Sequence, residues 1–270
     1  MLATVLALAA IVLAEPPEPK GPPTKEELAA ITERGRDLFA YDSACWHASD
    51  ALMAKKPPEG SFDRYIARKT EMGWTVAFGK LNEAGDRFLI AFEATPGEKP
   101  DQYKIEAFDP PKEDKGFLLA APKAVDLTIQ EFTKLPGLER RRYNVAILPA
   151  PEGNLWVYFM PAQTKAKIWP LGGDARFLVS ADGSNILERR RLHKSVIEVS
   201  PPDPDGNQQV AGMHTHILAD VPEDTDVFHV LTRKPSVPEV IRTEHWMYVV
   251  EPDGKISEPK KADEQGVELK

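Results

Sequence analysis

The chain has 270 residues, of which 34 are basic and 42 acidic, so its formal net charge is −8, and 42% of its residues are hydrophobic. The hydrophobic share is that of a globular protein, and the acidic balance argues against a nucleic-acid binder, which needs a basic face to displace phosphate counterions. The single cysteine excludes an intrachain disulfide framework and a cysteine-rich zinc cluster.

The N-terminus has the pattern of a secretory signal peptide. Residues 2–14 carry no charge and are almost entirely apolar, yet thirteen residues are too few to span a bilayer of about 30 Å as a helix. Val12 and Ala14 supply the small residues that precede a cleavage site, here before Glu15. We therefore expect a signal peptide over 1–14 and an extracytoplasmic protein, periplasmic or secreted; a buried N-terminal helix is the alternative. No later segment is apolar enough to cross a membrane.

A proline-rich leader is predicted over 15–23, followed by the first helix. Thr24 and Glu27 have the spacing of a capping box, in which each side chain accepts a hydrogen bond from the other's backbone. Apolar residues then recur at helical spacing to about Lys56, where two prolines follow. The pattern predicts one helix or a helix pair, since Gly35 offers an interruption.

Strands dominate the rest of the chain. A second helix is expected over 117–135, with Pro122 splitting it or starting its main part, and a short one over 221–231. Runs of β-branched and aromatic residues between turn residues predict the strands 74–78, 87–93, 102–108, 144–148, 155–160, 175–180, 186–198, 208–216 and 245–250.

These elements predict the α+β class, with an N-terminal helical segment, a mainly antiparallel sheet and a short C-terminal helix. Asp182-Gly183 is typical of a type I′ turn between neighbouring strands. We expect one α+β domain over 24–255, followed by a solvated tail over 256–270.

The sequence His214-Thr215-His216 is the strongest candidate for a site with chemistry. Side chains two apart on a strand leave the same face, so both imidazoles can bind one ion, and three protein ligands with a water form an open zinc site. Asp220 is expected to cap the next helix, with Asp226 about one turn inside it as the third ligand. His229 is the alternative third ligand, one helical step further on.

The spacing of His214, His216 and Asp226 resembles that of the JAMM/MPN metallopeptidases, over roughly residues 175–252. In that family a strand carries His-x-His and the next helix carries an aspartate. The resemblance implies that these three residues bind zinc and that the protein hydrolyses peptide or isopeptide bonds. Nine residues separate His216 from Asp226, where the family has ten, and Glu223 stands where the family has a serine that helps to stabilise the oxyanion.

The resemblance also implies an upstream glutamate that acts as the acid and base of the hydrolysis. Glu188 and Glu198 are the two candidates for this role. The whole chain is also similar to secreted proteins of Gram-negative bacteria, a likeness that names no reaction. It is carried by the segments AYDSACWHASDALMA, WPLGGDARFLVSADG and HTHILADVPEDTDVFHVLTRKP.

Two alternatives stand beside a zinc hydrolase with a peptide or protein substrate. One is a non-catalytic extracytoplasmic binding or envelope-interaction protein whose histidines are structural, and the other is a metal-binding protein without turnover. His193 is placed on the strand with Glu188, where it is either an ordinary packed histidine or a hydrogen-bond partner of a ligand. Cys45 is expected to be a buried apolar residue on the first helix. The sequence predicts no nucleic-acid partner and leaves the oligomeric state open.

Overall fold

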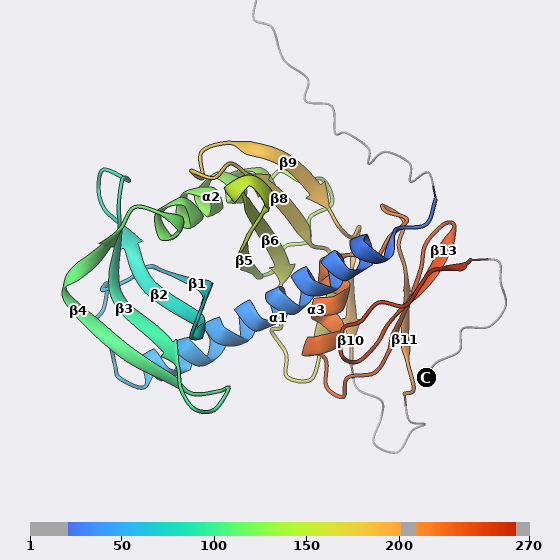
Figure 1. Cartoon of the computed structure of the whole chain (residues 1–270), viewed down its shortest axis with the longest axis horizontal. Coiled ribbons are helices and arrows are strands. Elements are labelled where there is room, and N and C mark those ends of the chain that lie inside the picture. The colour runs from blue at the N-terminus through green and yellow to red at the C-terminus, as the bar shows by residue number, and fades with distance from the viewer. Residues whose placement is uncertain (1–20, 201–208, 263–270) are drawn as a thin grey trace, which may run out of the picture.

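The structure is a computed structural model that describes residues 21–200 and 209–262. These residues form three α-helices and a set of mainly antiparallel sheets, which confirms the α+β class (Figure 1). The predicted signal peptide, most of the leader and the last eight residues lie outside the described part of the chain. Within that part, none of the helices combines the length and the apolar character needed to cross a membrane.

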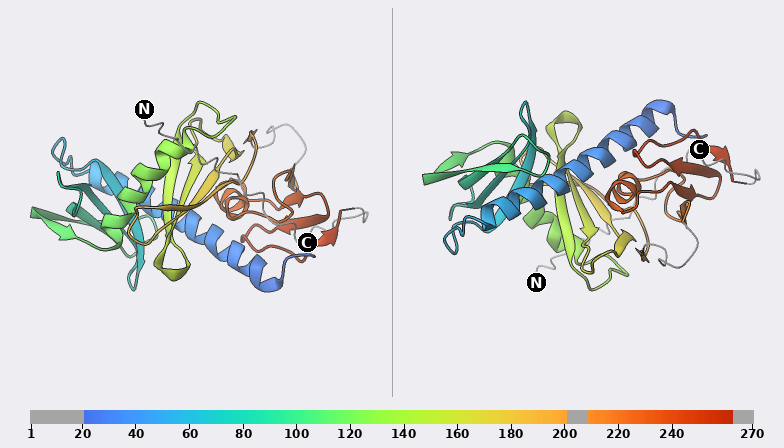
Figure 2. Two further views of the ribbon diagram at one scale, coloured as in Figure 1. Left: turned by 90° about the horizontal axis from the view of Figure 1, so that it is seen from above. Right: turned by 90° about the horizontal axis from the view of Figure 1, so that it is seen from below.

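Helix α1 (Lys25–Met53) is one continuous helix that begins at the predicted capping box. The Thr24 backbone donates to the Glu27 carboxylate at 2.7 Å, and the Glu27 backbone donates to the Thr24 hydroxyl at 3.1 Å. The helix runs unbroken through Gly35, which is buried. Figures 1 and 2 show α1 extending from the N-terminal sheet to the C-terminal sheet. Its first half therefore packs in one hydrophobic cluster and its second half in another.

The N-terminal sheet is an antiparallel meander of four strands. Its strands are β1 (Arg64–Thr70), β2 (Gly73–Leu81), β3 (Phe88–Pro96) and β4 (Tyr103–Asp114). Helix α2 (Phe117–Phe132) follows and contacts both this sheet and the next. The prediction that Pro122 splits this helix or starts its main part was wrong, because the helix begins five residues before Pro122 and continues past it.

The central sheet is also antiparallel, with the strand order β5-β6-β8-β9. Its strands are β5 (Tyr143–Pro149), β6 (Leu155–Pro161), β8 (Ala175–Val179) and β9 (Ile186–Arg191), and a short 3-10 helix, Pro151–Gly153, joins β5 to β6. The turn between β8 and β9 is not type I′. That type needs positive φ at two central residues, whereas here Gly183 has a φ of 77° and Asp182 does not lie in that region.

The predicted strand 186–198 is in fact two strands in different sheets. β9 ends at Arg191, and β10 (Val196–Val199) pairs with β7 (Trp169–Gly172) in a two-stranded ribbon. Between them the chain leaves the central sheet through a connecting segment in which Leu192 and His193 are both buried. The break places His193 on a connecting segment.

The C-terminal sheet has the order β11-β12-β13-β14. Its strands are β11 (Gly212–Thr215), β12 (Glu239–Arg242), β13 (Trp246–Val250) and β14 (Lys260–Lys261). β11 and β12 are parallel, and helix α3 (Asp224–Thr232) forms the connection between them. The prediction of a solvated tail over 256–270 was wrong at its first residue, because Ile256 is buried and forms a β-bridge with Val250.

Candidate metal site

His214 and His216 lie side by side at the end of β11. His214 is on the strand, and the His216 backbone continues the pairing by donating to the Arg242 carbonyl at 2.8 Å. The two Nε2 atoms are 3.1 Å apart, and both side chains are buried. The period of the strand therefore brings the two imidazoles together, as the sequence predicted.

Asp226 reaches this pair from the first turn of α3. Its Oδ1 atom lies 3.1 Å from Nε2 of His214 and 3.4 Å from Nε2 of His216. Its Oδ2 atom accepts a hydrogen bond of 2.7 Å from the Glu223 backbone, which fixes the carboxylate. The helix is capped by Glu223 with Asp226, and not by Asp220 as the sequence suggested. Asp220 instead accepts hydrogen bonds from the backbone and ring of His245, because the helix begins three residues later.

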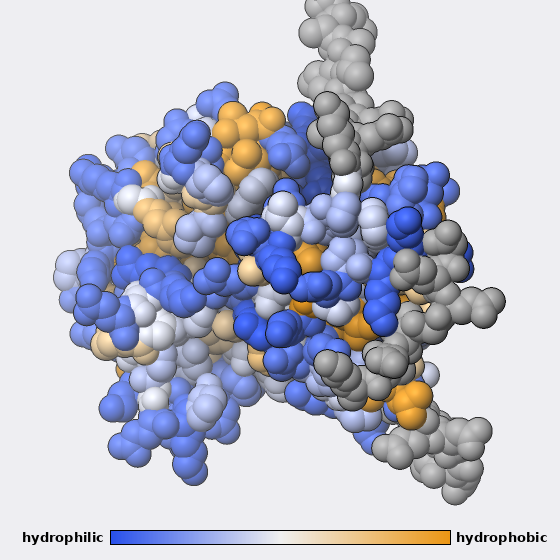
Figure 3. Space-filling model, turned by 45° about the vertical axis from the view of Figure 1, so that its right-hand side comes forward, coloured by the Kyte–Doolittle hydropathy of each residue, from blue (hydrophilic) through white to orange (hydrophobic). Residues whose placement is uncertain are grey.

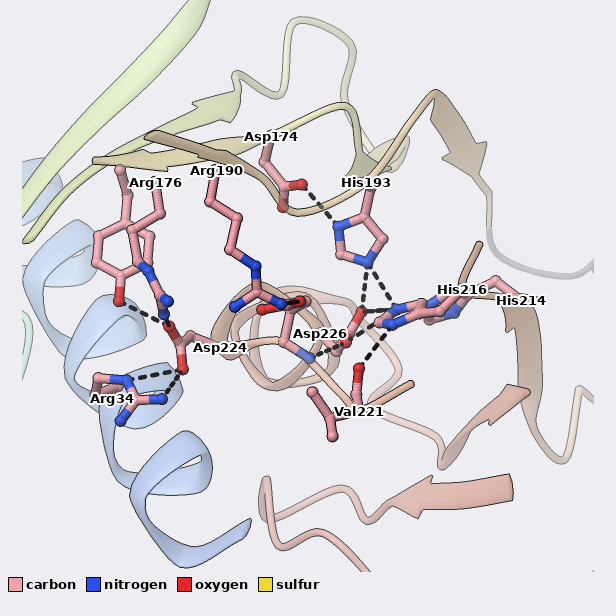
Figure 4. Close-up of polar contacts among 12 residues, drawn as sticks. Arg34, Asp174, Arg176, Arg190, His193, His214, His216, Val221, Asp224 and Asp226 are labelled. Carbon is pink, nitrogen blue, oxygen red and sulfur yellow. Dashed lines mark hydrogen bonds and ion pairs between the residues drawn. The ribbon is translucent and has the colours of Figure 1, made fainter. Parts of the chain in front are cut away.

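His193 is the fourth member of the cluster. Its Nε2 atom lies 2.8 Å from Nε2 of His216 and 3.1 Å from Oδ1 of Asp226 (Figure 4). The sequence interpretation placed it on a strand as a packed residue or as the hydrogen-bond partner of a ligand. No spacing rule connects it to the His-x-His motif, since 21 positions and a change of sheet separate it from His214. Its proximity depends on the break between β9 and β10.

His229 does not belong to the cluster, although the sequence offered it as an alternative third ligand. The ligand atoms that converge are those of His193, His214, His216 and Asp226. His229 is buried on α3, and its Nε2 atom has no hydrogen-bond partner among the described residues. Burial, with the nearby Arg233 guanidinium, lowers the pKa of His229 to about 4, so this imidazole is neutral.

The four atoms have the dimensions of a tetrahedral metal site. All lie within 4.8 Å of one another, and the separations among them given above run from 2.8 to 3.4 Å. Ligands at about 2.0–2.1 Å from a tetrahedral zinc ion are about 3.3 Å apart. The group could therefore hold a metal ion with only small side-chain adjustments.

A second layer of hydrogen bonds orients the three imidazoles. In each ring the Nδ1 atom faces an acceptor, so the proton resides on Nδ1 and the Nε2 lone pair points into the cluster. The pairs are His193 with Asp174 at 2.7 Å, His214 with Glu239 at 2.9 Å, and His216 with the Val221 carbonyl at 3.0 Å. Three lone pairs and one carboxylate oxygen meeting at one point repel one another unless a cation lies between them.

The charges of the cluster favour such a cation. Burial raises the pKa of Asp226, but the site histidines lower it more, so it lies well below its usual range. Burial lowers the pKa of His214, but Asp226 and Glu239 outweigh this effect and raise it to about 9. The pKa of His193 is likewise raised well above its usual value, because Asp174 and Asp226 outweigh the effect of burial. In the metal-free protein these shifts keep His193 and His214 protonated at neutral pH. A bound cation would displace the Nε2 protons and leave the imidazoles neutral, with their lone pairs as ligands.

Counted as ionised groups, the cluster and its acceptors carry two uncompensated negative charges. Asp174, Asp226 and Glu239 contribute three negative charges. Burial raises the pKa of Asp174 and of Glu239, but His193 with Thr225, and His214 with Arg233, together outweigh burial, so both pKa values are lowered. Arg233 returns one positive charge by donating to Glu239 at 2.7 Å. With three neutral imidazoles, a divalent cation balances the remainder.

The start of α3 is held in place by a buried ionic network beside the cluster (Figure 4). Asp224 accepts from Arg34 of α1 at 2.9 Å and from Arg176 of β8 at 2.7 Å, and its carboxylate also accepts from the Tyr158 hydroxyl at 2.7 Å. The neighbouring Glu223 accepts from Arg190 of β9. These contacts fix the helix turn that carries Asp226 against four other elements, α1, β6, β8 and β9.

A small pocket of about 70 Å³ opens over the histidines. All three site histidines line it, whereas Asp226 does not and is fully buried. The pocket therefore approaches the cluster from the histidine side, with the carboxylate on the other side. A small ligand can reach an ion bound there without displacing Asp226.

The two glutamates named as acid or base lie apart from this pocket. Glu188 is exposed on β9. Glu198 is exposed on β10 and forms ion pairs with Arg141 at 3.4 Å and Lys165 at 3.7 Å. Neither lines the pocket. Their role in catalysis stays a prediction from the sequence.

Comparisons with protein-family models, with curated proteins and with solved structures give no match for this chain.

Proposed function

We propose that this protein binds a divalent transition-metal ion, preferably zinc, through His193, His214, His216 and Asp226. The observation that carries the proposal is the convergence of three Nε2 lone pairs and one carboxylate oxygen, with every imidazole oriented by an acceptor at Nδ1. Imidazole and carboxylate ligands in a tetrahedral arrangement suit zinc, whereas calcium and magnesium prefer six or more oxygen ligands.

Elemental analysis of the purified full chain tests the metal site. We expect about one equivalent of metal per chain, and we expect the variant His214→Ala to lose it. His245→Ala is the matched control, because His245 is exposed and binds only Asp220. If His214→Ala left both metal content and stability unchanged, the metal site would be refuted, and a binding protein with structural histidines would be the better description.

We further propose that the bound metal supports hydrolysis of a peptide or isopeptide bond. The observation that favours this over simple storage is the pocket on the histidine side, through which a substrate group would have access to an ion held by the four residues. A zinc ion at such a position acts as a Lewis acid toward a carbonyl oxygen and lowers the pKa of water. The spacing of His214, His216 and Asp226 that resembles the JAMM pattern points in the same direction.

Peptide and isopeptide hydrolysis by the metal-loaded chain, with and without a chelator, tests this second proposal. Activity that is lost on chelation and restored by zinc supports it. Glu188→Gln and Glu198→Gln, measured in the same assay, test the sequence candidates for the acid and base: the variant of a true base keeps its metal and loses turnover. A fully loaded protein that cleaves none of a broad panel of peptides and isopeptides would favour metal binding without turnover.

We also propose that the protein is exported and that its mature form begins at Glu15. The support is the apolar, uncharged run over 2–14 and the proline-rich segment that follows it. Intact-mass measurement of protein recovered from the cell envelope should give the mass of the chain without its first fourteen residues. Cytoplasmic protein that still begins at Met1 would refute export.

A further inference from the structure

The pocket over the metal site has one polar side and one apolar side. Beyond the histidines, its lining includes the exposed side chains Ile197, Ile217 and Leu218 and the buried side chains Leu171 and Leu192. Large apolar side chains are rarely left at a surface in a group unless they meet a ligand or partner. Figure 3 shows that apolar residues are exposed at several places on one face of the molecule, among mostly hydrophilic ones.

The exposed apolar side chains come from two separate segments that meet only at the metal site. Ile197 lies on β10, directly after the segment that carries His193, whereas Ile217 and Leu218 follow His216. Their exposed fractions are 47%, 64% and 37%. The segments that supply the histidines therefore also supply the apolar wall.

The charges around the pocket restrict what can enter it. Among residues 21–200 and 209–262, no aspartate or glutamate lines it, and Lys194 is the one ionisable residue there besides the histidines. A cationic group would be repelled by Lys194 and by the bound metal. An acidic group would lose hydration against the aliphatic wall, and an exposed lysine returns little in exchange.

The size of the pocket restricts the ligand further. A cavity that binds benzene has a volume of about 150 Å³, and this pocket, at about 70 Å³, has about half that volume. That room suits a short alkyl side chain and does not suit an aromatic ring.

We propose that this pocket binds the acyl side of the substrate, with the carbonyl oxygen directed to the metal and a short aliphatic side chain packed against Ile197, Ile217 and Leu218. The inference rests on the proposed metal site. It specifies the substrate class of the proposed hydrolysis: amides whose acyl residue carries a small aliphatic side chain, such as valine or leucine.

Cobalt substitution tests the inference without any assay of turnover. The full chain is loaded with Co²⁺, whose visible absorption reports its coordination, and is then titrated with short hydroxamates. Three probes of similar length are compared: one with an isobutyl group, one with a carboxylate and one with an ammonium group. We expect each probe that binds to change the cobalt spectrum. We expect the isobutyl probe to bind about tenfold more tightly than either charged probe, because only the isobutyl group removes apolar surface from water.

Two variants assign the preference to the apolar wall. Ile197→Asp should abolish the preference for the isobutyl probe while the cobalt spectrum before ligand addition stays unchanged. Leu187→Asp is the matched control, because Leu187 is an exposed apolar residue of β9 outside the pocket lining, and this variant should keep the preference.

The two proposals fail in different ways. If the protein gives no cobalt spectrum of a bound ion, the metal site is refuted and this inference falls with it. If cobalt binds but the hydroxamates leave its spectrum unchanged, or the charged probes bind as well as the isobutyl probe, the metal site stands and the apolar acyl pocket is refuted. The apolar acyl pocket is also refuted if Ile197→Asp retains the preference for the isobutyl probe.

Discussion

Each histidine of the site is oriented by an acceptor from a different part of the chain. The Asp174 carboxylate lies just before β8, Glu239 begins β12, and the Val221 carbonyl lies between β11 and α3. An acceptor at Nδ1 keeps the proton there and leaves Nε2 free as a ligand. The same arrangement explains why His229 differs, since its Nε2 atom has no partner and its ring is held neutral by burial.

The variant His193→Ala should reduce zinc affinity more than a hundredfold. Loss of a residue that only hydrogen-bonds to a ligand typically lowers metal affinity ten- to hundredfold, and this substitution removes a ligand itself. Competition titration against a chromophoric chelator measures the affinity. His229→Phe keeps the bulk of a ring at a position outside the cluster and should bind zinc within a fewfold of the unmodified protein. Equal affinities of His193→Ala and His229→Phe would contradict the four-ligand assignment.

His229 should also make the metal-free protein less stable in mild acid. Its pKa is about 4 in the folded protein, against 6.5 for an unperturbed histidine. The folded state therefore binds fewer protons between these values, so this contribution to stability is complete above about pH 6.5 and is lost as the pH falls toward 4. From pH 7 to 5 the loss is about 2 kcal/mol, since one pKa unit corresponds to about 1.4 kcal/mol.

The variant His229→Phe provides the test of this acid sensitivity. Urea unfolding of both proteins, with a chelator present throughout, gives the free energy of unfolding at pH 7 and at pH 5. The variant should lose about 2 kcal/mol less than the unmodified protein over this interval. Parallel losses in the two proteins would show that His229 does not titrate on unfolding in this range.

At the level of elements, the position of Asp226 depends on how α3 crosses α1. Gly35 lies at the crossing: a Cβ atom there would be 2.6 Å from the Asp224 carbonyl oxygen and 2.7 Å from Cγ1 of Val227. The absence of a side chain lets the two helices approach closely. Arg34, one residue earlier, then reaches the Asp224 carboxylate.

The variant Gly35→Ala should destabilise the protein by about 1–3 kcal/mol, although alanine favours an isolated helix by about 1 kcal/mol over glycine. The added methyl group must push α3 away, so zinc affinity should fall as well. Urea unfolding and the chelator competition measure the two effects. Glu33→Ala is the control, because Glu33 is an exposed residue inside the same helix. A more stable Gly35→Ala variant with unchanged zinc affinity would contradict the close crossing.

Across the whole molecule, the site joins parts of the chain that are otherwise in different sheets. His193 follows the last strand of the central sheet, His214 belongs to the C-terminal sheet, and Asp226 lies on the helix that connects two of its strands. Helix α1 crosses both regions (Figure 2). A bound ion would therefore cross-link the central and C-terminal sheets.

Zinc should consequently raise the thermal stability of the full chain. A ligand that binds only the folded state, at a free concentration a thousand times its dissociation constant, adds about 4 kcal/mol to the free energy of unfolding. In a chain of this size that corresponds to a rise of about 8–16 °C in the melting temperature. Thermal unfolding with zinc and with a chelator measures the shift. Magnesium and His214→Ala are the controls and should give no comparable increase. A zinc shift that persists in His214→Ala would place the binding elsewhere.

The sequence alone determined the features that depend on local periodicity. The capping box of Thr24 and Glu27 and the helical spacing after it predicted α1, and the alternating strands predicted the α+β class. The period of two along a strand was sufficient to bring His214 and His216 together. The helix that follows was sufficient to suggest Asp226, because all three residues lie within one strand and helix unit.

Only the tertiary structure determined the contacts between distant segments. His193 joins the site because the chain leaves the central sheet after Arg191, a break that has no local signal in the sequence. Asp174 and Glu239 orient the histidines across 19 and 25 positions of the chain. Local rules describe the backbone of a segment, whereas the face it buries and the partner it meets depend on the packing of the whole chain.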